Sequence, residues 1–248
     1  MQPSFLELSD NHRIAYVLSE GMLPCVIFLG GFKSDMTGTK AAALEKSCKE
    51  RGQRFIRFDY TGHGKSSGKF QDGTIGEWKN DALAVIDRLG AEKNILVGSS
   101  MGAWISLICA LERQEKLVGL VGVASAPDFT EKLIWEQLKT AQKEQLKSEG
   151  IYYAPSCYGE EAYPITIQLI EEARNHLLLG KKITLDIPVR LLHGTLDEDV
   201  PWQISATLLQ LVSSKDASLT LIKGGNHRLS EPTQLDMMCE AVKTLCQP

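Results

Sequence analysis

The sequence lacks a strong excess of charge of either sign. Its 248 residues carry 27 Lys and Arg against 31 Asp and Glu, which gives a formal net charge of −4. The basic residues are scattered along the chain. Proteins that bind nucleic acid or an anionic membrane surface usually concentrate positive charge, so we expect neither as the main partner.

Long hydrophobic runs are also missing. No apolar stretch approaches the roughly 18 residues that a membrane-spanning helix needs, so we do not expect an integral membrane protein. The first residues, Met1 to Ser4, do not begin a basic segment followed by an apolar one, which is the pattern of a secretory signal. These features predict a cytoplasmic location, while the oligomeric state stays unknown.

The cysteines lack the close spacing of a zinc or redox site. None of the six forms a Cys-x-x-Cys pair, and most lie in apolar segments. They are expected to be small buried side chains in a reducing compartment. We therefore expect no metal and no organic cofactor. The cysteines are Cys25, Cys48, Cys109, Cys157, Cys239 and Cys246.

What the chain does contain is a series of apolar runs alternating with amphipathic segments. The length fits a single α/β domain over 1–248, and 43% of the residues are hydrophobic. Such alternation predicts a mostly parallel sheet with helices on both faces. Strands are expected at 5–8, 13–18, 25–29, 54–58, 93–97, 117–123, 189–192 and 218–222, the first two as an antiparallel pair.

The alternation stops in the middle of the chain. No strand signal is found between Pro127 and Asp186, where helices are expected at 130–148 and 167–177 around an irregular stretch at 151–164. About sixty residues without a strand more plausibly cover the sheet than belong to it. We therefore predict a helical cap inserted at about 128–186.

The pattern Gly98-Ser99-Ser100-Met101-Gly102 lies between an apolar strand and an apolar helix. This is the context of a nucleophile elbow, in which glycines let strand and helix cross closely around a strained serine. It predicts Ser100 as a nucleophile and the Met101 N–H as an oxyanion donor. The alternative is a chance match of this pattern in a glycine-rich loop. Residues later in the chain are needed to decide between the two interpretations.

An acid and a base follow in the order that such a nucleophile requires. Asp197 comes after the strand at 189–192, and His227 comes after the last strand. His227 would take the Ser100 proton, and Asp197 would orient the imidazole. Asp197 has the alternative role of a turn-capping carboxylate. Competing acids are Glu198, Asp199 and the more distant Asp128.

The other histidines have simpler interpretations. His12 is expected on a solvated turn, and His176 on the surface of a cap helix. His63 lies in a glycine-rich loop and is expected at the rim of the site. His193 precedes the acid and is expected to support its loop. These positions leave His227 as the candidate base.

A second oxyanion donor is expected after the strand at 25–29. There Gly30-Gly31-Phe32 brings a backbone N–H, that of Phe32, beside the elbow; the alternative is a simple tight turn. Apolar cap residues, together with Tyr152, Tyr153 and Tyr158, are candidates for an acyl or aromatic pocket. For any single one of them, packing of the cap on the sheet is the alternative.

Four segments carry a specific resemblance: GFKSDMTGTKA at 31–41, FIRFDYTGHGKSSG at 55–68, GSSMGAW at 98–104 and PVRLLHGTLDEDVPW at 188–202. The chain resembles the α/β-hydrolases, and among them the mitochondrial acyl-glucuronide esterase and palmitoyl-protein thioesterase branch. The resemblance implies a triad of Ser100, Asp197 and His227 and a mitochondrial location as the alternative. One departure is that Gly30-Gly31 replaces the His-Gly of many members, which predicts an oxyanion loop without support from a histidine side chain.

These residues predict a serine hydrolase that acts through an acyl-enzyme, and the resemblance implies acyl esters or thioesters as its substrates. Its substrate would be a small-molecule acyl ester or an acylated protein. Two alternatives stay open at this point. One is a peptidase, and the other is a non-catalytic small-molecule receptor on the same fold.

Overall fold

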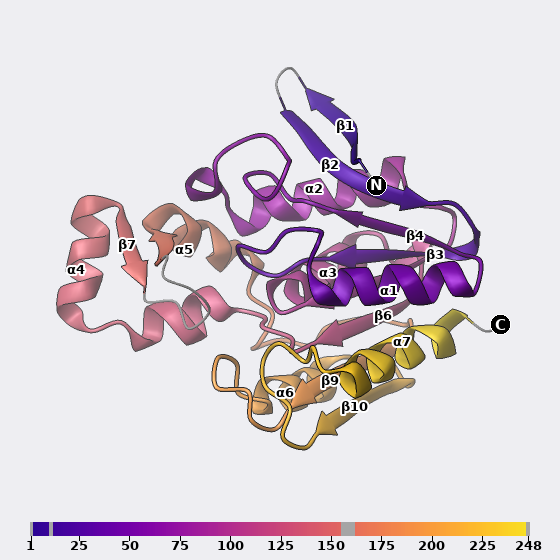
Figure 1. Ribbon diagram of the computed structural model, residues 1–248. Helices are drawn as coiled ribbons and strands as arrows, with labels where there is room; N and C mark the ends of the chain where they lie inside the picture. Colours follow the sequence, from indigo (N-terminus) through magenta and orange to yellow (C-terminus); the bar gives the residue numbers. More distant parts are fainter. Residues whose placement is uncertain (1, 10–11, 155–161, 247–248) are drawn as a thin grey trace.

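The computed structural model describes residues 2–9, 12–154 and 162–246. In this part of the chain, eight strands form one sheet in the order β1-β2-β4-β3-β5-β6-β9-β10 (Figure 1). The strands are β1 (Ser4–Ser9), β2 (His12–Ser19), β3 (Met22–Leu29), β4 (Gln53–Phe58), β5 (Asn94–Ser99), β6 (Leu117–Val123), β9 (Val189–Gly194) and β10 (Ala217–Ile222).

The sheet is antiparallel only at its N-terminal edge. β1 pairs antiparallel with β2, and β2 pairs antiparallel with β4, whereas every pair from β4 to β10 is parallel. All six residues of β5 are buried, as expected for a strand covered on both faces. The mostly parallel sheet and the antiparallel N-terminal pair are thus confirmed.

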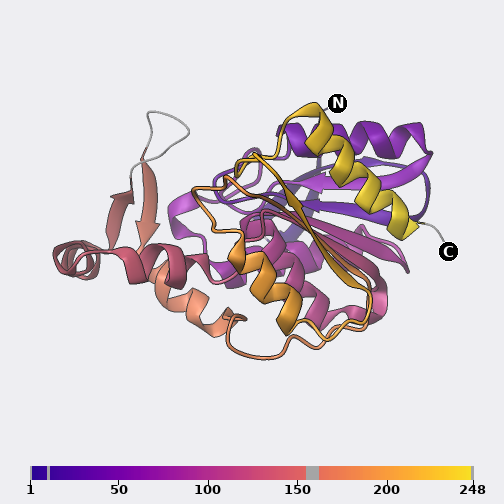
Figure 2. The same ribbon diagram turned by 90° about the horizontal axis from the view of Figure 1, so that it is seen from below.

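Helices cover both faces of this sheet, as predicted. On one face, α1 (Thr39–Glu50) and α7 (Pro232–Cys246) share an apolar cluster with β3, β5 and β6. On the other face, α2 (Ile75–Arg88), α3 (Met101–Glu112) and α6 (Gln203–Leu211) pack into a second cluster (Figure 2). Trp78 and Trp104 in this second cluster are completely buried. Aromatic side chains of this size dominate the apolar area that a core removes from water.

Between β6 and β9 lies a segment, residues 124–188, that we call the insertion. It contains α4 (Thr140–Glu149) and α5 (Ile167–Ala173), and it extends beyond the carboxyl ends of the strands (Figures 1 and 2). It also contains β7 (Ile151–Ala154) and β8 (Tyr163–Thr166), which pair antiparallel. The expectation of a segment without strands is therefore wrong. Four-residue strands, one with a proline, are too short to show a period in the sequence.

The single helix expected at 130–148 is also interrupted. A π-helical turn at Thr130–Ile134 and a 3-10 turn at Trp135–Gln137 precede α4. Leu138 then adopts an extended conformation, with ψ at 135°, which breaks the helical path. Sequence periodicity did not reveal this break. Among the helices of the described residues, none has the length and apolar character to cross a membrane.

Candidate active site

Ser100 occupies a sharp turn between β5 and α3. Its φ of 55° and ψ of −119° lie outside the regions that L-residues prefer, which costs roughly 1–3 kcal/mol and requires support from the surroundings. A side chain at Gly98 would overlap the backbone of Gly102 and Ala103, and one at Gly102 would overlap the carbonyl of Leu29. The strand, turn and helix predicted around Ser100 are confirmed, and the glycines are needed for the close crossing.

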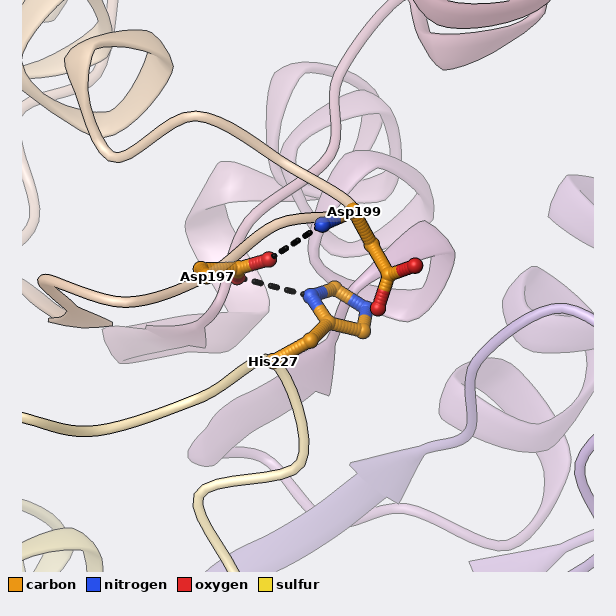
Figure 3. A group of neighbouring side chains, drawn as sticks. All are labelled: Asp197, Asp199 and His227. Atoms are coloured by element: carbon orange, nitrogen blue, oxygen red, sulfur yellow. Dashed lines mark hydrogen bonds and ion pairs between the residues drawn. The ribbon is translucent and has the colours of Figure 1, made fainter. Parts of the chain in front are cut away.

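His227 and Asp197 meet Ser100 at the carboxyl edge of the sheet. The Nε2 atom of His227 lies 3.0 Å from Ser100 Oγ, and its Nδ1 atom lies 2.8 Å from Asp197 Oδ2. The second of these contacts is drawn in Figure 3. Because the carboxylate only accepts, Nδ1–H must donate, which leaves a lone pair on Nε2 for the Ser100 hydroxyl. The geometry therefore suits proton transfer from Ser100 to His227.

The Asp197 carboxylate is completely buried and fully hydrogen-bonded. Oδ1 accepts the N–H groups of Asp199 and Val200, at 3.1 and 2.8 Å. Oδ2 accepts from His227 and also lies 3.0 Å from His193 Nε2. Burial alone raises the pKa of Asp197, but the hydrogen bonds from His193 and His227 hold that pKa well below its usual range. Asp197 is thus an anion under ordinary conditions.

The competing acids lie elsewhere or face other partners. Glu198 is exposed, and Asp128 accepts the N–H groups of Leu178 and Leu179 at 2.8 and 2.7 Å. Asp199 lies beside His227, on the other side of the ring from Asp197 (Figure 3). Of the four candidate acids, it is Asp197 that is hydrogen-bonded to His227 Nδ1.

Asp197, Asp199 and His227 have ligand atoms within 4.8 Å of one another, the one such group among the described residues. A cation there would take the lone pair of His227 that faces Ser100, or the carboxylate oxygen that accepts from Nδ1–H. The hydrogen bonds already made by these atoms favour proton transfer over metal binding.

Met101 follows Ser100 in the chain, and the loop that carries Phe32 passes next to Ser100; these are the two residues predicted to supply oxyanion donors. Met101 is the first residue of α3, where N–H groups have no acceptor within the helix. On the other side, a Cβ built on Gly31 would lie 3.5 Å from Ser100 Cβ, so the loop after β3 runs directly past the serine. The N–H of Ser34 closes that loop on the carbonyl of Gly31 at 3.1 Å. Phe32 lies inside this turn.

His63 is not at the rim but is 4% exposed. Its Nε2 accepts the backbone N–H of Lys33 at 3.3 Å, so the oxyanion loop does have support from a histidine side chain. The expectation of an unsupported loop is wrong because the histidine comes from the loop after β4 and not from the oxyanion loop itself. A histidine between Gly62 and Gly64, after a strand end, was the available signal.

The remaining histidines support the structure. His193 is fully buried, with Nδ1 2.7 Å from Ser205 Oγ, and it holds the acid loop as expected. His12 and His176 are partly buried rather than solvated. His12 lies 2.6 Å from Thr61 Oγ1, and His176 lies 2.7 Å from Glu172 Oε1.

A cavity of about 830 Å³ opens beside Ser100 and His227. Its apolar lining comes largely from the insertion and includes Ala126, Phe129, Leu133, Ile134, Ala154, Tyr163 and Ile165, with Phe32 from the oxyanion loop. Its charged lining consists of Lys33, Asp35, Lys40, Asp199 and Arg228. Burial lowers the pKa of Lys40 to about 8, and its ammonium donates to the carbonyl of Arg228, next to His227.

The tyrosines expected at this cavity are placed differently. Tyr152 accepts a hydrogen bond from Gln142 at 2.8 Å, and Tyr153 is 56% exposed. Neither lines the cavity, whereas Tyr163 does. Tyr158 and Cys157 lie outside the described residues.

This sheet, with Ser100, Asp197 and His227 at its carboxyl edge, defines an α/β-hydrolase. More narrowly, the chain belongs to the serine aminopeptidase S33 family, whose model matches residues 24–233. The palmitoyl-protein thioesterase ABHD10, mitochondrial, of Bos taurus is 40% identical over 245 residues, which is 98% of this chain and 79% of that protein. The Homo sapiens protein of the same name is 40% identical over 243 residues, with the same coverage.

Solved structures agree with this placement. The alpha/beta hydrolase domain-containing protein 10 from mouse superposes with a TM-score of 0.92 at 37% identity, covering 99% of this chain and 98% of that one. A hydrolase from Agrobacterium vitis S4 reaches a TM-score of 0.94 at 37% identity with the same coverage. The predicted fold and branch are confirmed, and the chain is an ester-hydrolysing enzyme.

Proposed function

We propose that this enzyme hydrolyses acyl thioesters and acyl esters, with Ser100 as nucleophile, His227 as base and Asp197 as the orienting acid. The observation that carries the proposal is the continuous contact from Ser100 Oγ through His227 to Asp197, at 3.0 and 2.8 Å. A serine hydroxyl is a weak nucleophile at neutral pH, and an adjacent oriented imidazole is what activates it.

The reaction proceeds in two steps. Ser100 Oγ attacks the acyl carbonyl while its proton passes to His227 Nε2, and His227 then protonates the departing alcohol or thiol. Water, deprotonated by the same nitrogen, releases the acid from the acyl-enzyme. In each step Asp197 stabilises the imidazolium, a role that its depressed pKa supports.

The N–H groups of Met101 and Phe32 serve as donors to the oxyanion. Negative charge develops on the carbonyl oxygen in both steps, and one such donor typically contributes about 3 kcal/mol to transition-state stabilisation. The donor at Met101 also gains from its place at the start of α3, where the helix dipole is positive. Both donors belong to the backbone, so replacing the side chain of Met101 or Phe32 does not remove either N–H.

The two kinds of cavity lining suggest how a substrate lies. The apolar side chains of the insertion suit an acyl chain, and the charged residues around Lys40 and Arg228 suit a polar leaving group. Because the mammalian relatives are named palmitoyl-protein thioesterases, we expect long acyl chains attached to thiols among the substrates of this enzyme. Acylated proteins and small-molecule acyl esters, acyl glucuronides among them, fall within this class. We treat 1–248 as a single domain with the insertion as its cap.

The peptidase alternative is supported by one observation. The matching family is described as a serine aminopeptidase, so peptide substrates belong in the test. The receptor alternative conflicts with the enzyme class of the family and of the relatives. The cytoplasmic location stays a prediction, and the mammalian relatives are named mitochondrial proteins.

The test is a substrate panel with matched variants. Palmitoyl and acetyl thioesters, the matching p-nitrophenyl esters, an acyl glucuronide and an aminoacyl anilide would be compared by kcat/KM. Wild type is expected to favour the long-chain esters and thioesters, and Ser100→Ala is expected to lose turnover of every substrate. Ser148→Ala, an exposed serine of α4, serves as the control. Preferential cleavage of the anilide would replace the proposal with the peptidase.

A further inference from the structure

The oxyanion loop turns sharply directly after Phe32. Lys33 has a φ of 56°, a left-handed conformation that L-residues with a side chain adopt at a cost of roughly 1–2 kcal/mol. In this conformation its backbone N–H donates to His63 Nε2 at 3.3 Å. The peptide that joins Phe32 to Lys33 is thus tied to a residue of another loop.

His63 is itself fixed by contacts on its other edges. Its Nδ1 lies 3.1 Å from the carbonyl of Thr61, which also accepts from Trp78 Nε1 at 3.0 Å. The ring packs edge-to-face against Phe70 and Trp78, with centroid distances of 5.0 and 5.2 Å. These contacts hold the ring in the orientation that brings Nε2 to Lys33.

The partners also determine where the single proton of the ring lies. The Thr61 carbonyl can only accept, so Nδ1 carries the hydrogen, and the Lys33 N–H can only donate, so Nε2 carries a lone pair. A second proton on Nε2 would turn this nitrogen into a donor that faces the Lys33 N–H, and the hydrogen bond between them would be lost. Burial lowers the pKa of His63 to about 4, which keeps the ring neutral around pH 7.

Phe32 rests on the same aromatic side chains. Its ring meets Phe70 at 4.8 Å and Trp78 at 5.9 Å, both edge-to-face. The backbone of Phe32 is therefore held between two hydrogen bonds, from Ser34 N–H to Gly31 and from Lys33 N–H to His63, while its side chain is held by the neighbours of His63.

We propose that His63 is a positioning residue that aims the Phe32 N–H at the developing oxyanion through its hydrogen bond to Lys33. The proposal rests on the function proposed above. An oxyanion donor binds the transition state more tightly than the substrate, so a misdirected donor lowers kcat with little change in KM. His63 does not contact substrate in this account.

Two carboxamide variants test the hydrogen bonds of the two ring nitrogens separately. In His63→Gln, the side-chain oxygen reaches the position of Nε2 and can still accept from Lys33. In His63→Asn, the shorter side chain reaches only the position of Nδ1 and can bond Thr61 but not Lys33. We expect His63→Asn to lower kcat about 10- to 100-fold with KM within about two-fold of wild type, a smaller loss than the 10²–10³ of deleting a donor. His63→Gln should stay within about five-fold of wild type in kcat.

The rate of phosphonylation of Ser100 by a fluorophosphonate gives a second readout, because that reaction also develops charge on the oxygen facing the donors. It should fall in parallel with kcat in His63→Asn. Equal kcat in the two folded variants, or a greater loss in His63→Gln, would overturn the proposal. If His63→Asn does not fold, a loss above about 100-fold in folded His63→Gln would also overturn it. An inactive wild type would instead refute the proposed function.

Discussion

The loops at the carboxyl edge of the sheet and the insertion face the same cavity but contribute different chemistry. The edge loops supply Ser100, Asp197, His227 and the proposed backbone donors, whereas the insertion supplies mainly apolar side chains. The difference suggests that the reaction and the choice of acyl chain reside in separate parts of the molecule.

Both regions are anchored to the rest of the fold by backbone hydrogen bonds. The edge loops are tied into the sheet by backbone hydrogen bonds, such as Ser100 N–H to Val123 and Thr195 N–H to Ile222, both 2.9 Å. The insertion is tied in the same way at its two ends, by Ala124 N–H to Leu192 at 2.8 Å and Ile183 N–H to Leu211 at 2.9 Å. A side chain adds a contact to α2, since Glu172 accepts the N–H of Gly76 at 2.9 Å. Because the two regions differ in what they contribute to the cavity, we expect substitutions at the edge loops to change kcat and substitutions in the insertion to change KM.

The largest expected difference in kcat is between variants of two histidines, one in an edge loop and one in the insertion. His227→Ala removes the base and is expected to lower kcat about a million-fold, as loss of such a group typically does. His176→Ala, in the insertion, should leave kcat within about ten-fold. Steady-state kinetics on a p-nitrophenyl ester measures both, and a similar loss in the two variants would remove the distinction between the regions.

The next contrast is between two aspartates. Asp197→Asn favours the wrong tautomer of His227, so kcat should fall about 10⁴-fold. Asp128→Asn keeps one acceptor for the N–H groups of Leu178 and Leu179, so it should lower the free energy of unfolding by about 1–2 kcal/mol with little effect on kcat. Kinetics and denaturant unfolding on both proteins test this, and a normal kcat in Asp197→Asn would contradict it.

A pH effect on stability is expected at the edge loop that carries His63. Burial lowers its folded pKa to about 4, below the unfolded value near 6.5. Between these two pKa values the unfolded state binds more protons than the folded state, so the free energy of unfolding falls as the pH falls. The stability that comes from a neutral His63 is fully present above about pH 6.5 and is lost as the pH falls towards 4. The difference between the folded and unfolded pKa of His63 changes the free energy of unfolding by on the order of 3 kcal/mol over this pH range. Unfolding of wild type and His63→Gln from pH 7 to 4 should show a smaller decline in the variant; parallel declines would speak against it.

The smallest effect concerns the acyl pocket. Ile165 lines the cavity, whereas Ile170 belongs to the same apolar cluster but does not line it. Ile165→Ala should raise KM for a long-chain ester about ten-fold and leave a short-chain ester unchanged, in keeping with 1–3 kcal/mol for lost apolar contact. Ile170→Ala should lower stability without changing the chain-length preference. Equal changes in both variants would place the acyl chain elsewhere.

The sequence predicted the sheet and the edge-loop residues better than it predicted the insertion and the surroundings of His63. The sheet and its three reactive side chains were predictable, because buried strands leave long apolar runs and the elbow requires Gly98 and Gly102. The β7–β8 hairpin was not, because each strand spans only four residues. The position of His63 between two glycines after a strand end was a signal in the sequence, but its contact with Lys33 was not predictable. That contact depends on how Phe70 and Trp78 pack around a loop from a different strand.

The most direct test of the central claim is to react the protein with a fluorophosphonate, measure the intact mass and map the modified peptide. We predict one adduct per chain, located on Ser100, absent in Ser100→Ala and formed far more slowly in His227→Ala. A folded wild-type protein that stays unmodified, or that carries the adduct on another residue, would contradict the assignment of Ser100 as the nucleophile.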